Sequence, residues 1–177
     1  MSYDLLIGDR AYSSWSLRAW LLVDKAGLPC RVRSARLYSD DWAPALAPFA
    51  PAATVPALRT PDRTLVFDSL AIAEELAERH PEARLWPADP ARRAAARSVA
   101  AEMHAGFAAL RAECPMNLRA AYDGVETSEA VRRDLARLEV LWAWASARGG
   151  GRGPWLFGDW SIADAVFSPV AARIATY

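Results

Sequence analysis

The segment from Asp9 to Cys30, DRAYSSWSLRAWLLVDKAGLPC, decides the fold of the first half of the chain, because it joins two predicted strands through one apolar helix. Gly27 is a typical helix end, and Pro29 prevents the helix from resuming. The pattern predicts a strand at Asp4–Ile7, a helix at Trp15–Ala26 and a second, alternating strand at Cys30–Ser34. The chain therefore begins with a β-α-β unit.

The next predicted elements complete a small sheet. A short helical piece at 40–46 and a loop at 50–56 precede two strands, which flank the turn Thr60-Pro61-Asp62-Arg63 and form a hairpin. A helix then begins at Ser69. A β-α-β unit followed by a hairpin and a helix is typical of an α/β thioredoxin-like sheet, which we expect over residues 1–80.

The composition changes after residue 80. Residues 81–90 contain three prolines and are predicted to be a linker. Residues 91–177 are expected to be an all-α domain, with helices at Ala91–Glu113, Ser128–Ala147 and Ser161–Tyr177, and with a flexible glycine-rich connection at 149–154. Ser161 and Asp164 form a capping box for the last helix, which is apolar all round and should be buried. Because the sequence stops within this helix, we expect the C-terminal domain to be incomplete.

Length, charge and cysteine content exclude several classes of protein. Over 177 residues the 21 basic and 21 acidic side chains balance, which favours neither nucleic acid nor an anionic membrane as a partner. No apolar run approaches the roughly 20 residues of a membrane span. Cys30 and Cys114 have no metal-ligand spacing, so we expect no metal site. Without an N-terminal signal segment, the chain is expected in the cytoplasm, with reduced thiols.

Three segments are predicted to meet at one edge of the sheet. Ser13 stands at the start of the first helix, where its hydroxyl and the helix N–H groups suit an anionic sulfur, although an ordinary helix cap explains it equally. Asp68 and Ser69 begin another helix, which is either a carboxylate site or again a cap. A cis Val55-Pro56 bond would present backbone N–H and C=O groups to an extended peptide, whereas a trans bond is the usual form.

The chain resembles the cytosolic glutathione transferases along essentially its whole length. YSSWSLRAWLL is similar to the S-S-x-S-x-R-V motif of the zeta class, which includes maleylacetoacetate isomerases, and of related bacterial transferases. APAATVPAL, FDSLAIAEELAERHP and FGDWSIADAVFSPVAARIATY resemble three further segments of the family. The resemblance implies a thioredoxin-like domain, an all-α glutathione transferase C-terminal domain, glutathione as co-substrate, and a homodimer.

The resemblance also implies roles for individual residues. Ser13 matches the serine that donates a hydrogen bond to the glutathione sulfur, and Ser14 matches its supporting neighbour. The remaining matches are Val55, whose backbone pairs with the cysteinyl unit, the cis-proline Pro56, and Asp68 with Ser69, which hold the γ-glutamyl group. Thr54 takes the place of a longer Lys or Gln, and Ala50 that of an Asn, so the glycyl end of glutathione has to be held differently.

The implied reaction is attack by a glutathione thiolate on a small electrophile, or isomerisation of that electrophile. The serine remains a hydroxyl throughout and is not itself a nucleophile. Four residues of the long helix are candidates to border the electrophile pocket, although core packing or surface exposure also accounts for each of them: Met103, His104, Phe107 and Arg111. A binding protein without turnover and a glutathione-dependent peroxidase remain alternatives. Trp15 stands where redox relatives carry a cysteine, so disulfide exchange is not available at this loop. Serine at the sulfur position favours conjugation or isomerisation over thiol exchange.

Overall fold

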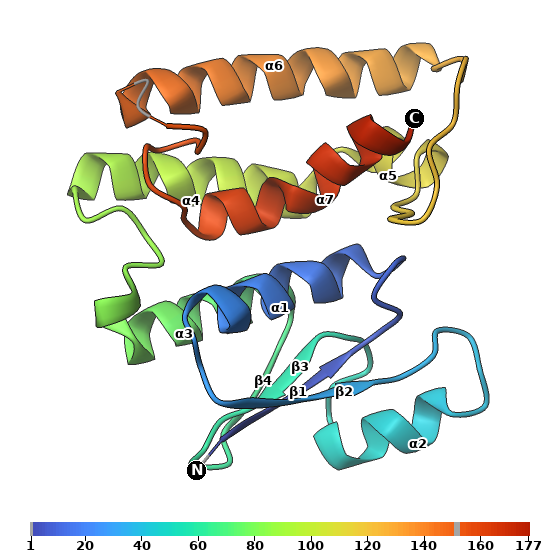
Figure 1. Ribbon diagram of the computed structural model, residues 1–177, viewed down its shortest axis with the longest axis vertical. Coiled ribbons are helices and arrows are strands. Elements are labelled where there is room, and N and C mark those ends of the chain that lie inside the picture. Colours follow the sequence, from blue (N-terminus) through green and yellow to red (C-terminus); the bar gives the residue numbers. More distant parts are fainter. Residues whose placement is uncertain (1, 151–152) are drawn as a thin grey trace. The chain divides into compact units, whose positions relative to one another are not determined.

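The computed structural model of the chain describes residues 2–150 and 153–177 and divides them into two compact units (Figure 1). The first unit is Met1–Ala83 and the second is Arg84–Tyr177, so the boundary falls within the segment predicted to be a linker. In the predicted glycine-rich connection, Gly151 and Arg152 lie outside the described residues.

The first unit is built on a four-stranded sheet in the order β2-β1-β3-β4. Its elements are β1 (Tyr3–Ile7), α1 (Ser14–Lys25), β2 (Cys30–Ser34), α2 (Trp42–Leu46), a 3-10 turn at Ala47–Phe49, β3 (Ala57–Arg59), β4 (Leu65–Phe67), α3 (Ser69–Arg79) and a 3-10 turn at Pro81–Ala83. β1 pairs in parallel with β2, and β1–β3 and β3–β4 are antiparallel. This arrangement confirms the predicted thioredoxin-like sheet, including both strands of the hairpin.

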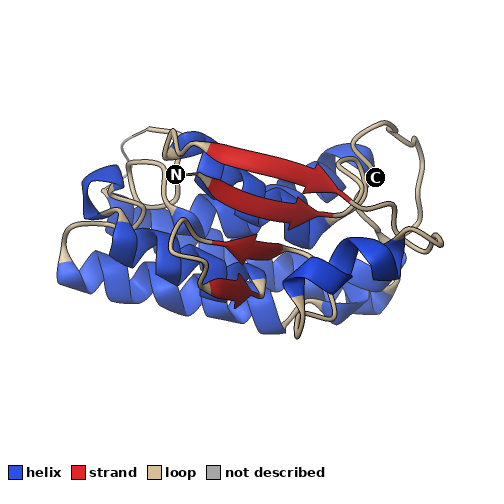
Figure 2. Ribbon diagram, turned by 90° about the horizontal axis from the view of Figure 1, so that it is seen from below, coloured by secondary structure: helices blue, strands red, loops and turns tan. Residues whose placement is uncertain are grey.

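The two faces of this sheet are covered differently. Neighbouring residues of a strand face opposite sides, so Leu5 and Leu6 belong to different cores. Leu6 packs with Phe49 and Ala57 in a cluster beneath α2. Leu5, paired with Leu58, faces α1 and α3, which pack on each other. In Figure 2, α2 covers only one end of the sheet face that is turned toward the viewer.

The second unit is helical throughout its regular structure, as predicted. It contains α4 (Pro90–Ala105), α5 (Ala108–Glu113), α6 (Glu129–Gly149) and α7 (Ile162–Thr176). α4 packs against both α6 and α7, and α5 packs against α6. The predicted capping box begins α7: the Asp164 carboxylate accepts hydrogen bonds from Ser161 N at 2.9 Å and Ser161 Oγ at 3.0 Å. The first turns of α7 are buried as predicted, whereas Ile174 in its last turn is exposed.

The prediction of one long helix at Ala91–Glu113 is wrong, because the chain breaks between α4 and α5. Gly106 is extended and Phe107 is left-handed, with a φ of 60°. The last carbonyls of a helix have no intrahelical donor. Here the Arg111 guanidinium donates to the carbonyl oxygens of Met103 and of His104, the latter at 2.9 Å. A helix-breaking glycine and an arginine that bonds the freed carbonyls together allow the bend.

Candidate functional site

The strand register brings the three predicted site segments to one edge of the sheet, the one at which β1 ends. Leu6, Ala57 and Phe67 lie side by side on β1, β3 and β4. β1 leaves this edge into the loop that ends at Ser13, and β4 leaves it into Asp68 and Ser69. β3 enters from Val55 and Pro56 at the same edge. The predicted convergence is therefore confirmed for the backbone of these segments.

Ser13 caps α1 and takes part in a short chain of hydrogen bonds. Its Oγ lies 2.8 Å from Ser16 Oγ and 3.4 Å from Ser16 N. Ser16 Oγ in turn accepts a hydrogen bond from Gly8 N at 2.9 Å. Ser13 is 7% exposed, and Ser14, the first residue of α1, is half-buried. Both the predicted cap and a hydroxyl network behind it are therefore present at this helix start.

Gly8 allows the loop before α1 to fold closely over this network. A Cβ atom at Gly8 would lie 2.9 Å from the side chain of Leu37 and 3.2 Å from Ser13 Oγ. The contact with Leu37 is shorter than real Cβ atoms show, and the contact with Ser13 Oγ is tighter than most, so a larger residue would press on the Ser13 hydroxyl. Sequence reasoning missed Gly8 and Ser16 because their roles depend on a contact between a strand end and a helix.

α1 also contains a buried cation that the sequence interpretation treated only as part of a motif. The Arg18 guanidinium lies 4.4 Å from the centroid of the Trp15 ring, and Arg18 is almost fully buried. Such a cation–π contact fixes the orientation of both side chains. The positive charge of Arg18 therefore lies one turn along α1 from the Ser13 cap.

The segment before β3 has backbone groups without partners. The Val55–Pro56 peptide bond is cis, as the resemblance implied, and Ala50–Pro51 is a second cis bond that was not predicted. The side chain of Val55 is buried in the cluster beneath α2. Among the described residues, neither the N–H nor the C=O of Val55 has a hydrogen-bond partner. Thr54 is exposed at this edge.

Asp68 and Ser69 begin α3 in an unusual way. Asp68 has φ 74° and ψ 135°, a conformation that costs a non-glycine residue of order 1–3 kcal/mol. Its carboxylate accepts hydrogen bonds from Leu70 N at 2.7 Å and Ala71 N at 3.4 Å. Ser69 is only 3% exposed, and its Oγ has no hydrogen-bond partner within residues 2–150 and 153–177. Asp68 thus caps the helix, which leaves the Ser69 hydroxyl available for another group.

The predicted electrophile-pocket residues surround the break between α4 and α5. Met103 and Phe107 are buried, with exposed fractions of 1% and 6%. His104 and Arg111 are half-buried, and burial lowers the pKa of the Arg111 guanidinium. Their assignment to a substrate pocket stays a prediction.

Neither cysteine belongs to the three site segments. Cys30 begins β2 opposite Tyr3, at the other end of β1, and Cys114 follows α5. Burial raises the pKa of the Cys30 thiol to about 11 and also raises that of Cys114. Neither thiol is therefore activated for nucleophilic chemistry at neutral pH.

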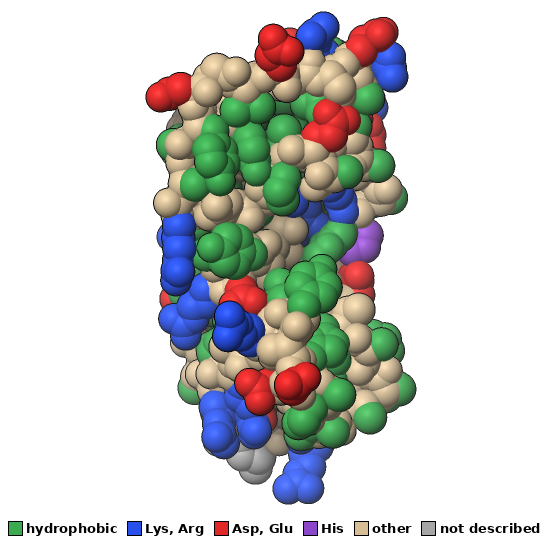
Figure 3. Space-filling model, turned by 90° about the vertical axis from the view of Figure 1, so that its right-hand side faces the viewer, with side chains coloured by type: hydrophobic (Ala, Val, Ile, Leu, Met, Phe, Trp, Pro, Cys, Tyr) green, Lys and Arg blue, Asp and Glu red, His purple; other side chains and the backbone are tan. Residues whose placement is uncertain are grey.

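The helical unit contains an apolar cavity of about 350 Å³. It lies between α5, α6 and the C-terminal end of α7, and its lining includes Leu138, Trp142 and Ile174. Figure 3 shows hydrophobic side chains gathered on the face of this unit that turns toward the viewer. In the described part of the chain, no helix is long and apolar enough to cross a membrane, and no group of side chains is arranged to hold a metal ion.

Comparison with known proteins agrees with the geometry of the first unit. The family model described as glutathione S-transferase, N-terminal domain, matches residues 12–79, which include all three site segments. Residues 12–79 therefore belong to the glutathione S-transferase family. A probable maleylacetoacetate isomerase of Caenorhabditis elegans is 30% identical to this chain over 136 residues, and glutathione S-transferase omega-2 of Mus musculus is 29% identical over 131 residues. These alignments cover 75% and 73% of the chain, but only 62% and 51% of the two relatives.

Solved structures extend the likeness to nearly the whole chain. A glutathione transferase homolog from Burkholderia, solved with bound glutathione, has a TM-score of 0.71 at 25% identity. The superposition covers 98% of this chain and 82% of the Burkholderia chain. Glutathione transferase Omega 2S of Trametes versicolor has a TM-score of 0.69 at 23% identity, and the superposition covers 98% of this chain and 71% of the Trametes chain. The relatives include an isomerase and omega proteins, so the comparisons support the family and leave the class open.

Proposed function

We propose that this chain binds glutathione at the sheet edge and activates its thiol for conjugation to a small electrophile, or for isomerisation of that electrophile. The observation that carries the proposal is the set of unsatisfied polar groups there: the buried Ser69 Oγ and the backbone N–H and C=O of Val55. Buried polar groups are nearly always hydrogen-bonded, so groups without partners on one edge favour a polar ligand. Glutathione is the ligand that the Burkholderia relative binds.

The tripeptide would lie along the edge as an added strand. The N–H and C=O of Val55 would pair with its cysteinyl unit, as extended peptides pair with a free strand segment. The first turn of α3 and the Ser69 hydroxyl would hold the γ-glutamyl carboxylate, because a helix N-terminus favours an anion. Asp68 would attract the ammonium group beside that carboxylate, and Ser14 and Thr54 would line the same groove.

The thiol would be activated by a relay of hydroxyl groups. The Ser13 and Ser16 hydroxyls lie 2.8 Å apart, and rotation lets either one donate to the other. Ser16 already accepts a hydrogen bond from Gly8 N. When Ser16 donates its own O–H to Ser13, the O–H of Ser13 is free to donate to the sulfur. A hydrogen bond to a charged acceptor is worth about 1.5–3 kcal/mol, which lowers a thiol pKa by roughly 1–2 units.

Serine at this position favours conjugation or isomerisation over thiol exchange. A peroxidase that works through a protein disulfide needs an activated cysteine, and burial raises the pKa of both Cys30 and Cys114.

A binding protein without turnover remains the second candidate. Met103, His104, Phe107 and Arg111 are proposed to border the electrophile. Thiol consumption with a panel of activated aryl halides and cis-enediones separates an enzyme from a binding protein.

Titration of bound glutathione tests the proposal. We expect the absorbance of the thiolate to report a pKa about 1–2 units below that of free glutathione, and Ser13→Ala to restore most of the difference. Ser16→Ala should recover part of it, because Ser13 loses its donor. Ser98→Ala is the matched control, since the Ser98 hydroxyl bonds only the Ala94 carbonyl on an exposed face of α4. An unchanged pKa in Ser13→Ala would refute the relay while leaving glutathione binding intact.

A homodimer and a cytoplasmic location are further parts of the proposal. Three exposed alanines lie on one face of α4 and would permit close contact with a second copy: Ala94, Ala101 and Ala105. Ala108, which was expected on the same face, lies beyond the break, on α5. Light scattering of the purified protein measures the mass of the particle directly, and a monomer across the micromolar range would contradict the dimer.

A further inference from the structure

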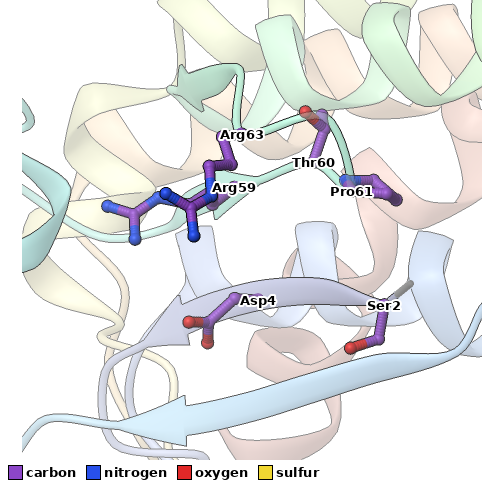
Figure 4. Close-up of a pocket in the computed structure, with 6 residues that line it drawn as sticks. All are labelled: Ser2, Asp4, Arg59, Thr60, Pro61 and Arg63. Carbon is purple, nitrogen blue, oxygen red and sulfur yellow. The ribbon is translucent and has the colours of Figure 1, made fainter.

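A second polar recess lies at the opposite end of the sheet, where β1 begins and the β3–β4 hairpin turns. Its volume is about 590 Å³. The residues that line it come from two segments of the first unit and are Ser2, Asp4, Arg59, Thr60, Pro61 and Arg63 (Figure 4). The glutathione proposal uses none of them, and the register places the recess at the N-terminal end of β1, away from Ser13.

The one carboxylate that lines the recess is already neutralised. Arg33 of β2 binds Asp4 with both arms of its guanidinium, at 2.8 Å and 2.7 Å. This pair accounts for the charge of Asp4 without either arginine of the recess. Asp62, in the adjacent turn, accepts hydrogen bonds from Thr60 Oγ1 and Thr64 N and is paired with Arg79.

Two guanidinium groups remain to face the recess. Arg59 is held in place, because it donates to the carbonyl oxygen of Pro48 and its guanidinium lies 5.2 Å from the centroid of the Phe49 ring. Arg63 is exposed, and no ion pair or hydrogen bond holds its guanidinium within the described residues. Figure 4 shows both side chains extending from the hairpin in the same direction. Within residues 2–150 and 153–177, neither arginine is paired with a carboxylate.

The turn holds Arg63 in a defined position. Thr60 N donates to Thr64 O and Arg63 N donates to Thr60 O, both at 2.9 Å, and Arg63 has a left-handed φ of 71°. A non-glycine residue adopts this conformation only when surrounding contacts hold it there. The backbone therefore fixes where the Arg63 side chain leaves the hairpin, and the Phe49 contact restricts Arg59.

We propose that this recess binds the phosphate group of a small phosphorylated molecule between Arg59 and Arg63. Two guanidinium forks match the geometry and the double charge of a phosphate monoester better than they match a single carboxylate. Ser2 lines another part of the same recess, across from Pro61, and adds a hydroxyl donor there (Figure 4). The inference is independent of the proposed glutathione chemistry, because the two sites share no residue.

Titration with phenyl phosphate, followed through backbone amide shifts in nuclear magnetic resonance spectra, tests the site and its position. We expect shifts at Arg59, Thr60 and Arg63 that saturate, and weaker binding of benzoate, which carries one charge. Arg63→Gln should weaken phenyl phosphate binding about fivefold. Arg59→Gln should do the same, and Arg119→Gln, at an exposed arginine of the second unit, should leave it unchanged.

Three outcomes overturn the proposal: equal weakening by Arg63→Gln and Arg119→Gln, shifts confined to Val55 and Ser69, or benzoate binding as tight as phenyl phosphate. Vesicles containing phosphatidic acid identify the source of the phosphate. Binding of vesicles that is lost in Arg63→Gln, without binding of phenyl phosphate, would overturn the soluble ligand in favour of a lipid headgroup. Glutathione binding by Arg63→Gln, measured in parallel, should equal that of the unmodified chain, which keeps the two proposals separable.

Discussion

Ser69 is the residue at which the structure and the proposed function are most closely linked. Its hydroxyl is buried without a partner in the described structure, so Ser69→Ala removes no hydrogen bond from the free protein. We expect the free energy of unfolding to stay the same or rise by up to about 1 kcal/mol, because a desolvated hydroxyl is removed. The affinity for glutathione should fall roughly tenfold, since a hydrogen bond to a charged carboxylate is lost.

Urea denaturation and calorimetric titration measure these two quantities on the same variant. Ser161→Ala is the contrasting control, because the Ser161 hydroxyl donates to Asp164 and its loss should destabilise the protein while leaving glutathione binding intact. A Ser69→Ala variant that is less stable yet binds glutathione normally would assign Ser69 a purely structural role.

Cys30 provides a test of electrostatics at a single residue. Because burial raises its pKa to about 11, the thiolate fraction at pH 8 should be roughly 100-fold lower than that of an unperturbed thiol. In a Cys114→Ala variant, the rate of alkylation by iodoacetamide should therefore keep rising with pH to about 11. A rate that levels off near pH 9 would mean that Cys30 is more accessible than its place on β2 indicates.

The positions of the main site residues could be predicted at this scale, but their contacts could not. Ser13, Val55 and Ser69 follow from the order of strand ends and helix starts along the chain. The link from Gly8 N to Ser16 Oγ could not be predicted, because it joins segments whose approach depends on the packing of α1 on β1. The positive φ of Asp68 could not be predicted either, since a non-glycine residue rarely adopts such a backbone conformation.

Among the elements, the end of α6 makes the sharpest prediction. A Cβ atom at Gly149 would lie 2.8–2.9 Å from backbone atoms of residues 156–158, which fold back over the helix end. We expect Gly149→Ala to lower the free energy of unfolding by about 3 kcal/mol, the upper part of the usual range for overpacking. Helix propensity alone predicts the opposite sign, a gain of about 1 kcal/mol.

Gly150→Ala separates packing from backbone strain. Gly150 has a φ of 82°, and no atom lies within 4 Å of the position of an added Cβ. Its substitution should cost only about 1–2 kcal/mol, from the left-handed conformation. If urea denaturation finds Gly149→Ala to be as stable as the unmodified chain or more so, the close packing of the 156–158 segment is wrong.

Elements with a strong local signal were predictable, and the one with two competing signals was not. The hairpin strands and the start of α3 follow from the turn residues and the apolar alternation around them. Between α4 and α5 the apolar spacing continues through Gly106. That spacing predicts one continuous helix, whereas the glycine favours a break. The bend depends on Arg111, which donates hydrogen bonds to the freed carbonyls from the next helix. That contact could not be predicted from the apolar periodicity.

For the molecule as a whole, the proposal places ligand binding in the first of two compact units. Hydrogen exchange of the full chain with saturating glutathione should therefore show added protection in residues 8–17, 53–58 and 67–72. At 100 times the dissociation constant, ligand binding adds about 2.7 kcal/mol to the stability of the protein. Protection found mainly in residues 90–177 would move the site into the helical unit and contradict the proposed groove.

The direction of β1 has a practical consequence. The strand runs from the arginine recess, where Ser2 contributes to the lining, to the edge that holds the glutathione groove. An affinity tag joined ahead of Ser2 would begin at the lining of this recess and crowd it, whereas immobilisation through such a tag would keep the opposite edge open. Surface-based assays of glutathione can therefore use tagged protein, but phosphate titrations require that the tag be cleaved first.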